Sequence, residues 1–588
     1  MNPSPNNKIN SAKSKEIISR DLEDHKIEES IHISRALKLI NQGKYTDAEK
    51  IYRQLISLNT QNHLVYSNLA ALIGLKGNKN EMVILLKQAL NLYPNFPEAL
   101  CNLGSALKDL GDLRGAIESF KKAIKFKPNF ADAYYNLGNT FKQIGDFDSS
   151  IICYKEALKY KTIFPEAFSN LGFSLKEKGN INKAISNYKK AIKLKFNYPE
   201  AHNNLGIALK DNGDILKAID CFKQAIAIMP TFSKAHNNLG NALKEMGNLK
   251  EAIVSYKQAI KLEPDLSDAH RNLACSLLLT GNYQEGWLEY EYRWEQKGKI
   301  SITHAQPNIP RWQGENLNKN EKLLVVTEQG LGDCIQYMRY IPYLRQLGID
   351  VIFSAQEKLH SLIKNSNIDS HPLTPSEANK IKDGKWISLL SLPRYLNVSP
   401  KNPIAVEPYI STTDKLLDKW HHILAIEKEP IIGLNWQGDP KIEKTSYQGR
   451  SIPLEDLSKL FKFNKFKALS LQKGYGSEQL ENCSFKERFV ACQHQVNSTW
   501  DFSEKVAIIS KCDLVITCDT SIAHLAGAMG QKVWLLIKKI PFWAWGIEGT
   551  HTFWYPSMKL FRQKEKDNWY EVIDLVSLEL NKEFSKRR

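Results

Sequence analysis

At 588 residues the chain is too long for a single hydrophobic core, so we expect it to divide into two or more domains. Hydrophobic residues make up 42% of it, yet the longest uncharged apolar runs, Leu514–Cys518 and Val533–Ile537, have only the length of a strand. No membrane-spanning helix is therefore expected. The formal net charge of +16 favours anionic ligands or partners.

Residues 1–28 are polar and rich in lysine and glutamate, and they lack the apolar stretch of a secretory signal. We predict that this segment is disordered. The nine cysteines form no Cys-x-x-Cys pair, so neither a disulfide framework nor a structural zinc site is suggested. A reducing cytoplasm is the compartment that fits this pattern.

The next part of the chain repeats itself every 34 residues. An asparagine–leucine pair recurs seven times, beginning at Asn68, Asn102, Asn136, Asn170, Asn204, Asn238 and Asn272. A glycine keeps the same period at Gly43, Gly77, Gly111, Gly145, Gly179, Gly213, Gly247 and Gly281. A fixed period of this length is typical of a solenoid of stacked helices.

Each unit has the pattern of two short amphipathic helices. In the unit Pro97–Phe130, Gly104 is small enough for the partner helix to approach, and Gly111 ends the first helix. The second helix carries Ala116 and Phe120 at helical spacing. These spacings resemble the tetratricopeptide repeat, and about eight units cover residues 29–295. The resemblance implies an all-α solenoid with a concave surface built from the first helices.

Paired lysines, such as Lys121-Lys122 and Lys189-Lys190, fall on the second helices. That position is typical of a solvated outer face, which argues against nucleic acid as the partner.

The seven asparagines allow two interpretations. In the tetratricopeptide family this position faces the inner groove, and an amide that both donates and accepts can bind an extended peptide backbone. The series resembles the asparagine ladder of the O-GlcNAc transferase family, which implies a protein or peptide partner in the groove. Alternatively, Asn-Leu-Gly is simply a common sequence for a first helix of this kind.

The last unit is rich in aromatic residues, including Trp287, Tyr290 and Trp294, and a connector follows at residues 296–320. We expect these aromatics to cap the open end of the solenoid and to dock it onto the next domain. Trp312, in the connector, either joins this packing or stacks on a ligand.

From Lys322 onward, short apolar runs alternate with helical stretches, which predicts parallel sheets with ligands at the carboxyl ends of the strands. Strands are expected at Leu323–Thr327, Val351–Ala355, Ile431–Gln437, Phe466–Leu471, Asp513–Asp519 and Val533–Ile537. A helix is expected over Asp333–Leu347, and a final one over about Asn568–Phe584. The pattern predicts two Rossmann-like halves, residues 321–415 and 416–588, with a cleft between them.

Four motifs in this region, in this order, resemble those of the ADP-heptose:lipopolysaccharide heptosyltransferases. They are Glu328-Gln329-Gly330-Leu331-Gly332-Asp333, Gly433…Pro440…Arg450-Ser451-Ile452-Pro453-Leu454, Ser470-Leu471-Gln472-Lys473-Gly474 and Asp519-Thr520-Ser521…His524. The resemblance implies an α/β GT-B domain of two Rossmann-like halves, the acceptor on the first and a nucleotide-sugar donor on the second. It also implies that the final helix crosses back to the first half.

The first motif is expected on the acceptor side, with Gln329, Gly330, Gly332 and Gln336 around the ligand. The glycines let the backbone come close to it. In the resembling heptosyltransferases the aspartate of this loop is thought to be the general base, and Asp333 occupies that position. The alternative is an aspartate that caps the following helix.

The remaining motifs are expected to bind the donor. Asp519, Thr520, Ser521 and His524 stand where a helix begins, and such an end attracts phosphate. Arg450, Ser451 and Lys441 follow the first strand of the second half, and Gln472 and Lys473 follow the next strand. A cation there would stabilise a leaving diphosphate.

The only Asp-x-Asp, Asp146–Asp148, lies in a repeat turn, so we expect no metal and no cofactor beyond the nucleotide sugar. One departure from the family is Ala544, between Trp543 and Trp545, where relatives often have an arginine.

The sequence thus predicts a cytoplasmic, metal-independent glycosyltransferase that acts on a protein recruited by its repeats, with oligomer formation possible. The alternative is an interaction scaffold whose transferase-like domain is inactive. A third possibility is transfer to a lipid-linked or polysaccharide acceptor.

Overall fold

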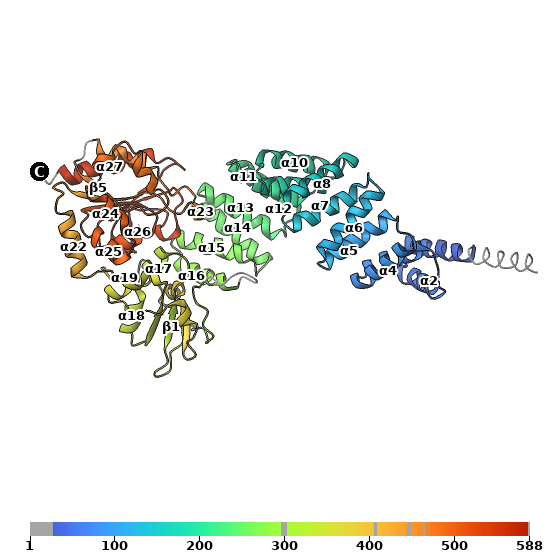
Figure 1. Ribbon diagram of the computed structural model, residues 1–588, viewed down its shortest axis with the longest axis horizontal. Coiled ribbons are helices and arrows are strands. Elements are labelled where there is room, and N and C mark those ends of the chain that lie inside the picture. The colour runs from blue at the N-terminus through green and yellow to red at the C-terminus, as the bar shows by residue number, and fades with distance from the viewer. Residues whose placement is uncertain (1–26, 296–302, 405–407, 444–447, 463–464, 586–588) are drawn as a thin grey trace, which may run out of the picture. The chain divides into compact units, whose positions relative to one another are not determined.

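A computed structural model describes residues 27–295, 303–404, 408–443, 448–462 and 465–585. Residues 1–26 of the predicted disordered segment and residues 296–302 of the predicted connector lie outside this part of the chain. The chain forms two compact units, Met1–Asn238 and Leu239–Arg588. The division falls inside the repeats, so the last repeats belong to the same unit as the α/β region (Figure 1).

The first unit is an all-helical solenoid of antiparallel helix pairs. After a helix at residues 27–41, it contains α2 (Tyr45–Ser57), α3 (His63–Leu75), α4 (Lys79–Leu92), α5 (Pro97–Asp109), α6 (Leu113–Phe126), α7 (Ala131–Gln143), α8 (Phe147–Tyr160), α9 (Pro165–Glu177), α10 (Ile181–Leu194), α11 (Pro199–Asp211) and α12 (Ile215–Ile228). Helix α13 (Ser233–Met246) begins here and ends in the second unit.

Two kinds of glycine shape each pair. The periodic glycine that follows the first helix has a positive φ, for example +86° at Gly111, so it ends the helix as predicted. The glycine inside the first helix faces the aromatic ring of the second. A Cβ at Gly104 would lie 2.7 Å from Cε1 of Phe120, and one at Gly172 would lie 2.9 Å from that of Tyr188. The predicted close approach of the two helices is confirmed.

Within successive units of the solenoid, a repeated ion pair joins the start of the first helix to the end of the second. Lys127 binds Glu98 at 2.7 Å, Lys161 binds Asp132 at 3.1 Å and Lys195 binds Glu166 at 3.1 Å. Both partners are largely exposed, and exposed pairs contribute only about 0–1 kcal/mol each. The apolar contacts therefore supply most of the stability, and the ion pairs add little to it.

In the second unit the repeats end with α14 (Leu249–Leu262), α15 (Ser267–Leu279), α16 (Tyr283–Tyr290) and the 3₁₀ turn η1 (Glu291–Glu295). Trp287 is buried against Trp543, with ring centroids 5.2 Å apart, and its Nε1 donates to the carbonyl of Val398 at 2.9 Å. Trp312 is buried too, and its Nε1 donates to the carbonyl of Glu315. The expected docking of the aromatic cap is confirmed, and Trp312 belongs to this packing.

The first lobe, residues 303–404, has a parallel three-stranded sheet in the order β2 (Val351–Ser354), β1 (Leu323–Val326), β3 (Lys385–Ser388), with Leu323 beside both Val351 and Lys385. Its helices are α17 (Leu331–Tyr337), α18 (Tyr340–Gln346), α19 (His360–Asn365), α20 (Pro375–Ala378) and α21 (Leu392–Tyr395), with 3₁₀ turns η2 (Glu357–Leu359) and η3 (Leu389–Ser391). The single helix predicted over Asp333–Leu347 is wrong. The chain breaks at Met338–Arg339, which places Pro342 in a first turn, where its missing N–H is not needed.

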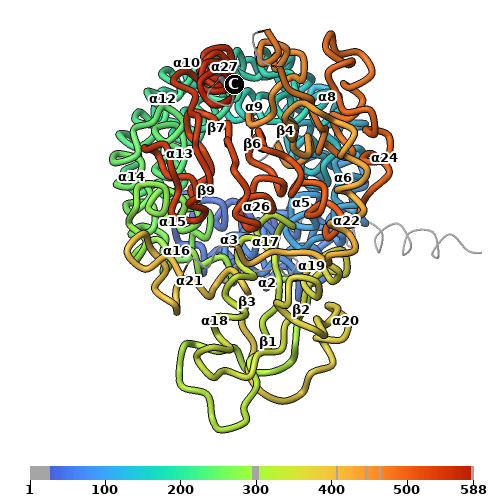
Figure 2. The backbone as a smooth tube through the Cα atoms, turned by 90° about the vertical axis from the view of Figure 1, so that its left-hand side faces the viewer, coloured from blue at the N-terminus to red at the C-terminus, as the bar shows by residue number. Residues whose placement is uncertain are grey.

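The second lobe, residues 408–585, has a six-stranded sheet in the order β5-β4-β6-β7-β9-β8. The strands are β4 (Ile431–Asn435), β5 (Lys467–Ser470), β6 (Leu514–Cys518), β7 (Val533–Ile537), β8 (His551–Thr552) and β9 (Tyr555–Arg562). All pairs are parallel except β8 with β9, so the sheet is mixed. Figure 2 shows β9, β7, β6 and β4 in succession across the lobe.

The helices of this lobe are α22 (Asp414–Leu424), α23 (Pro440–Glu443), α24 (Gln493–Ser498), α25 (Phe502–Ile509), α26 (Ser521–Ala528) and α27 (Tyr570–Ser585). Its 3₁₀ segments are η4 (Leu454–Phe461), η5 (Ser477–Glu481), η6 (Lys486–Arg488) and η7 (Trp543–Trp545). The expectation that the last helix crosses back to the first half is wrong. The buried side chains of α27, such as Ile573 and Val576, pack in the core of the second lobe with Leu457 and Trp534.

A buried cation joins the two lobes. Arg339, at the start of α18, donates to the carbonyl of Trp554 at 2.8 Å and to the hydroxyl of Tyr409 at 3.1 Å. Because carbonyls and hydroxyls satisfy it, this arginine fixes the orientation of the lobes.

Candidate functional site

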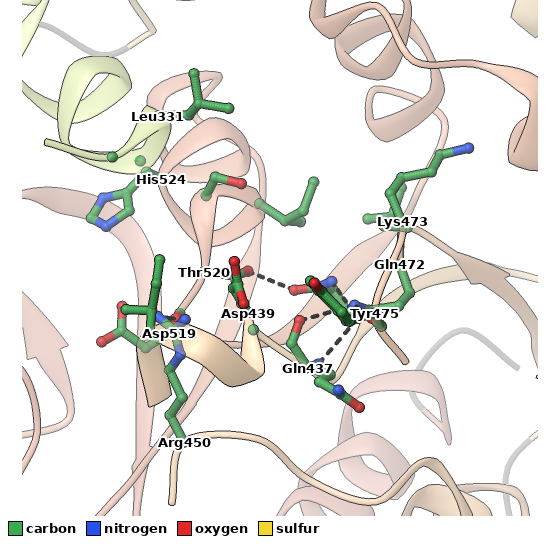
Figure 3. A pocket seen from close by; sticks show the side chains of 18 of the residues that line it. Leu331, Gln437, Asp439, Arg450, Gln472, Lys473, Tyr475, Asp519, Thr520 and His524 are labelled. Atoms are coloured by element: carbon green, nitrogen blue, oxygen red, sulfur yellow. Dashed lines mark hydrogen bonds between the residues drawn. The ribbon is translucent and has the colours of Figure 1, made fainter. Parts of the chain in front are cut away.

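A cavity of about 680 Å³ lies between the two lobes, where the carboxyl ends of β1, β4, β5 and β6 meet. Ligands bind at this edge of parallel sheets, so the position agrees with the sequence-based expectation. In Figure 3, Arg450, Asp519 and His524 lie on one side of the cavity and Gln472, Lys473 and Tyr475 on the other. Thr520 and Asp439 lie between them.

Most of the predicted site residues line this cavity. They are Gln329, Gly330, Gly332, Asp333, Arg450, Gln472, Lys473, Asp519, Thr520, Ser521 and His524.

Three predicted residues do not line it. Gln336 is fully buried in α17, and within the described residues neither of its amide atoms has a hydrogen-bond partner. Lys441 is an exposed residue of α23. The hydroxyl of Ser451 accepts from the backbone N–H of Gly438 and donates to Glu443. It therefore stabilises the loop after β4 and does not line the cavity.

Asp333 has the capping role that the sequence left open, and its role as a general base stays a prediction. Its Oδ2 accepts from the backbone N–H of Gly330 at 3.1 Å, which caps α17. Burial, together with the charges of Asp519 and Glu328, raises the pKa of this carboxyl to about 7. A carboxyl that titrates near neutrality in a cavity wall is suited to proton transfer.

The two glycines of the first loop, Gly330 and Gly332, have different structural roles. Gly330 has φ −84°, which any residue adopts. A Cβ at Gly332 would lie 3.0 Å from Cδ2 of His524 and 3.4 Å from Cα of Ser521. Gly332 therefore lets α17 of the first lobe pack directly on the start of α26 of the second.

A network of side-chain amides holds the second-lobe loops. Asn435 accepts from the hydroxyl of Thr520 at 2.5 Å and donates to Oε1 of Gln472 at 2.7 Å. Oε1 of Gln472 also accepts from the backbone N–H of Gln437, and its Nε2 donates to the carbonyls of Gln437 and Tyr475. Gln472 thus holds the cavity loops together, and both the oxygen and the nitrogen of its side-chain amide are hydrogen-bonded to other residues of the protein.

Arg450 and Asp519 are held together at one side of the cavity. Arg450 Nη1 donates to the backbone carbonyl of Asp519 at 2.9 Å, and its Nε donates to Glu443 at 3.2 Å. Burial raises the pKa of Asp519, against the opposing effects of Trp545, Arg450 and Lys538. The positive charge of Arg450 is therefore largely balanced by its own neighbours.

His524 is a buried, neutral residue. Its Nδ1 is hydrogen-bonded to the hydroxyl of Tyr555 at 3.1 Å, and its ring stacks on Trp545 with centroids 5.1 Å apart. Burial, with the nearby charge of Arg339, lowers the pKa of His524 to about 3. It cannot neutralise a phosphate, but it can contribute a polar edge to the cavity wall.

The sequence did not single out Lys505, which is 8% exposed and lines the cavity from α25. Burial lowers its pKa, and burial together with the charge of Lys505 lowers the pKa of Lys473 to about 8. The sequence offered little signal, because Lys505 simply follows Ser503 and Glu504 and precedes the apolar run Val506–Ile509. Leu471, Tyr475 and Phe542 are further lining residues that sequence reasoning missed.

The asparagines of the repeats are used in part by the solenoid itself. Nδ2 of Asn170 donates to Tyr135 and Asn139, and its Oδ1 accepts from Lys142 at 3.0 Å. Asn136 and Asn238 donate to the residues 35 positions earlier, Cys101 and Asn203. Asn68 donates to Tyr52, Asn204 is half-buried, and Asn102 is exposed. Asn272, in the second unit, is half-buried. Peptide binding by this series stays a prediction.

Comparisons with known proteins identify the repeats. Models described as "Tetratricopeptide repeat" match residues 85–118, 131–161, 199–232 and 233–266, and one described as "TPR repeat" matches residues 104–145 and 174–213. The chain therefore contains tetratricopeptide repeats, as the spacing predicted. None of the helices in the described residues is long and apolar enough to span a membrane.

Among curated proteins, the chain is similar to Protein FlbA of Caulobacter vibrioides (strain ATCC 19089 / CIP 103742 / CB 15), with 23% identity over 299 residues. The match covers 46% of this chain and 48% of FlbA, so the chain spans about half the length of that relative.

Solved structures with some similarity include MamA, with 30% identity over 28% of this chain and 95% of that one and a TM-score of 0.27. Another is MamA 41-end from Desulfovibrio magneticus RS-1, with 24% identity over 29% and 96% and a TM-score of 0.28. YrrB, titled a TPR protein with an unusual peptide-binding site, shows 22% identity over 31% and 95% and a TM-score of 0.28. At these TM-scores the likenesses carry no structural conclusion.

Proposed function

We propose that the second unit is a GT-B glycosyltransferase, built from two Rossmann-like halves, that moves a sugar from a nucleotide-sugar donor to an acceptor hydroxyl. One observation carries the proposal. The cavity at the carboxyl ends of the parallel strands of two α/β lobes brings together a carboxyl that titrates near neutrality and basic side chains. These are the groups that deprotonation of a hydroxyl and departure of a diphosphate require.

In this proposal Asp333 is the general base. Its carboxylate takes the proton of the acceptor hydroxyl while the hydroxyl oxygen bonds to the anomeric carbon of the sugar. The bond from that carbon to the diphosphate oxygen breaks, and the nucleoside diphosphate leaves with the electron pair. The lysines of the cavity stabilise the charge on the leaving group, a role that needs no metal ion.

The acceptor in this proposal is a protein recruited by the repeats. Tetratricopeptide repeats typically bind peptides or proteins, and exposed or half-buried asparagines are present on the first helices. The reaction is proposed to take place in a reducing cytoplasm, because all nine cysteines lie in the described residues as free thiols.

A donor screen tests the proposal. Thermal unfolding of the full-length protein is followed with UDP, GDP, ADP and CMP sugars, and nucleotide release is then measured with the sugar that binds. We expect one donor to stabilise the protein and to be consumed. Asp333→Asn should lower the rate by about 10²–10⁴-fold, the usual contribution of a general base. Asp383→Asn, at an exposed position of the same lobe, is the matched control.

A scaffold function is the second candidate, favoured by the repeats themselves. If no nucleotide sugar binds or is consumed, while a partner protein is retained through the repeats of both wild type and Asp333→Asn, the scaffold function replaces the enzymatic one.

A further inference from the structure

The cavity is electrostatically uneven. Around Arg450 and Asp519 the charges oppose one another, and Asp333 lies close enough to Asp519 for the two carboxyls to interact. On the other side in Figure 3, Lys473 reaches the cavity beside Gln472 and Tyr475. Lys505 joins it there, since each of these two lysines lines the cavity and the charge of Lys505 acts on Lys473.

Lys505 is a buried cation that no acidic side chain of the described residues contacts. Within the described residues no acceptor lies within hydrogen-bonding distance of its Nζ, which sits 4.6 Å from the centre of the Phe502 ring. Asp501, the acidic residue that acts on it electrostatically, is occupied as the cap of α25, where it accepts from the N–H of Glu504. A buried ammonium in this state is stabilised by a ligand that brings negative charge.

Lys473 has spare capacity for the same ligand. Its Nζ donates to the carbonyl of Val496, and an ammonium has three donors, so further donors remain for the cavity. Its position on the loop after β5 is fixed, because Gln472 beside it is held by Asn435, Gln437 and Tyr475. The two lysines thus offer hydrogen-bond donors to the cavity from two separate elements, the loop after β5 and helix α25.

We infer that Lys473 and Lys505 together bind the diphosphate of the ligand, and that the side of the cavity around Asp333, Asp439 and Asp519 receives its uncharged, hydroxyl-bearing part. This inference rests on the proposed function for the nature of the ligand, and it moves the phosphates away from Arg450. Two ammonium groups match the charge of a diphosphate, whereas the carboxyls of Asp439 and Asp519 repel it. Those carboxyls accept hydrogen bonds from sugar hydroxyls instead.

The test is isothermal titration of the full-length protein with inorganic pyrophosphate and with UDP. Lys505→Met and Lys473→Met keep the apolar stem of the side chain and remove the charge. Each should weaken pyrophosphate binding at least tenfold, whereas Lys505→Arg should retain it. Lys428→Met, an exposed lysine of the same lobe, should change the affinity less than twofold. Thermal unfolding of each variant shows whether it is folded.

The outcomes separate this inference from the proposed function. If a nucleotide sugar is turned over and both methionine variants, folded, bind pyrophosphate like wild type, the inference is overturned and the function stands. If the lysine variants lose pyrophosphate binding while no nucleotide sugar binds or reacts, the diphosphate site stands and the proposed function fails. If wild type binds neither pyrophosphate nor UDP, the inference is overturned.

Discussion

The hydroxyl of Tyr290 accepts a hydrogen bond from Nε2 of Gln329 at 2.8 Å. Tyr290 is the last residue of α16 in the repeats, and Gln329 lines the cavity with a positive φ of 61°. Beside this bond, the buried Glu328 is paired with Arg293 at 2.7 Å. The final repeat therefore holds the loop that carries Asp333, and it is a structural part of the candidate site.

Replacing Tyr290 by phenylalanine should release this loop with little loss of stability. Gln329 is exposed, so water can replace the lost acceptor, and we expect a cost of about 0.5–1.5 kcal/mol. Ligand-dependent stabilisation by a bound nucleotide sugar should fall more than the stability itself. Tyr340→Phe is the control, because that hydroxyl is buried without a hydrogen-bond partner in the described residues. Equal effects of the two variants would contradict the positioning role.

Breaking the Arg293–Glu328 ion pair should lower the stability of the protein more than Tyr290→Phe does. Arg293→Met leaves the carboxylate of Glu328, which is 0% exposed, without its cation, and breaking such a pair costs about 3–5 kcal/mol. The double variant Arg293→Met/Glu328→Gln should recover much of this loss, because the remaining amide is neutral and can still accept from Ser388. Urea denaturation of wild type, the single variant and the double variant measures both the loss of stability and its recovery. A double variant no more stable than the single one would show that the charge is not the cause.

Gly332 and Gly330 should respond differently to alanine. The new Cβ of Gly332→Ala meets His524 and Ser521 of α26, so the two lobes are pushed apart, and overpacking of this kind costs about 1–3 kcal/mol. Gly330→Ala meets only Oδ2 of Asp333, at 3.1 Å, and its φ suits alanine. Melting temperatures of the two variants should therefore separate. If Gly330→Ala instead weakens ligand binding with unchanged stability, the close approach of a ligand predicted from the sequence applies to that residue.

The raised pKa of Asp333 predicts a dependence of stability on pH. In the unfolded chain an aspartate ionises near pH ~3.9, whereas burial holds the proton of Asp333 in the folded protein up to a pKa of about 7. The stability that the protonated carboxyl contributes is fully present below the unfolded value and is lost as the pH rises through the folded one.

Asp333→Asn cannot ionise and still accepts from Gly330. Relative to this variant, wild type should lose stability between about pH 4 and pH 7 and then level off. Melting curves of both proteins across this range measure the difference. The transfer rate of wild type, if Asp333 is the base, should rise through the same pKa of about 7. A constant difference in melting temperature would show that the carboxyl titrates normally.

Two asparagines of the repeats form a matched pair. Asn170 makes three side-chain hydrogen bonds, so Asn170→Ala should destabilise the first unit by about 1–3 kcal/mol. Asn102 is exposed and makes no side-chain hydrogen bond in the described residues, so Asn102→Ala should alter stability by less than about 0.5 kcal/mol. If the series binds an acceptor peptide, Asn102→Ala should still weaken peptide binding. Binding that is unchanged in Asn102→Ala would favour the purely structural interpretation.

The repeats could be predicted almost completely, because the helices of every unit pack through the same kinds of residue at the same positions. The contact between Gly172 and Tyr188 follows from a spacing visible in the sequence. The strands before the cavity were also predicted, since they are short apolar runs followed by polar loops. Strand β9 was missed because Pro556 and Lys559 interrupt its apolar pattern.

What the sequence could not supply was the direction of individual side chains. Gln336 lies three residues after Asp333 on the same short helix, yet the packing of the lobes buries it away from the cavity. Lys505 follows Glu504 on α25 and looks like an ordinary surface lysine in the sequence, but the fold turns it toward the loops after β4 and β5. Neither orientation follows from helical periodicity, because both depend on how separate elements are placed against each other.

The ion pairs that recur along the first unit bear on how such a chain can change over generations. Deleting residues 131–164, one full period, would remove the Lys161–Asp132 pair whole and leave the Lys127–Glu98 and Lys195–Glu166 pairs intact, because each pair lies inside one repeat. Unequal exchange within a gene can therefore lengthen or shorten this part by whole repeats and alter the partner surface it offers. The segment from α15 onward has no spare copy, because Trp287, Tyr290 and Arg293 are each committed to the lobes.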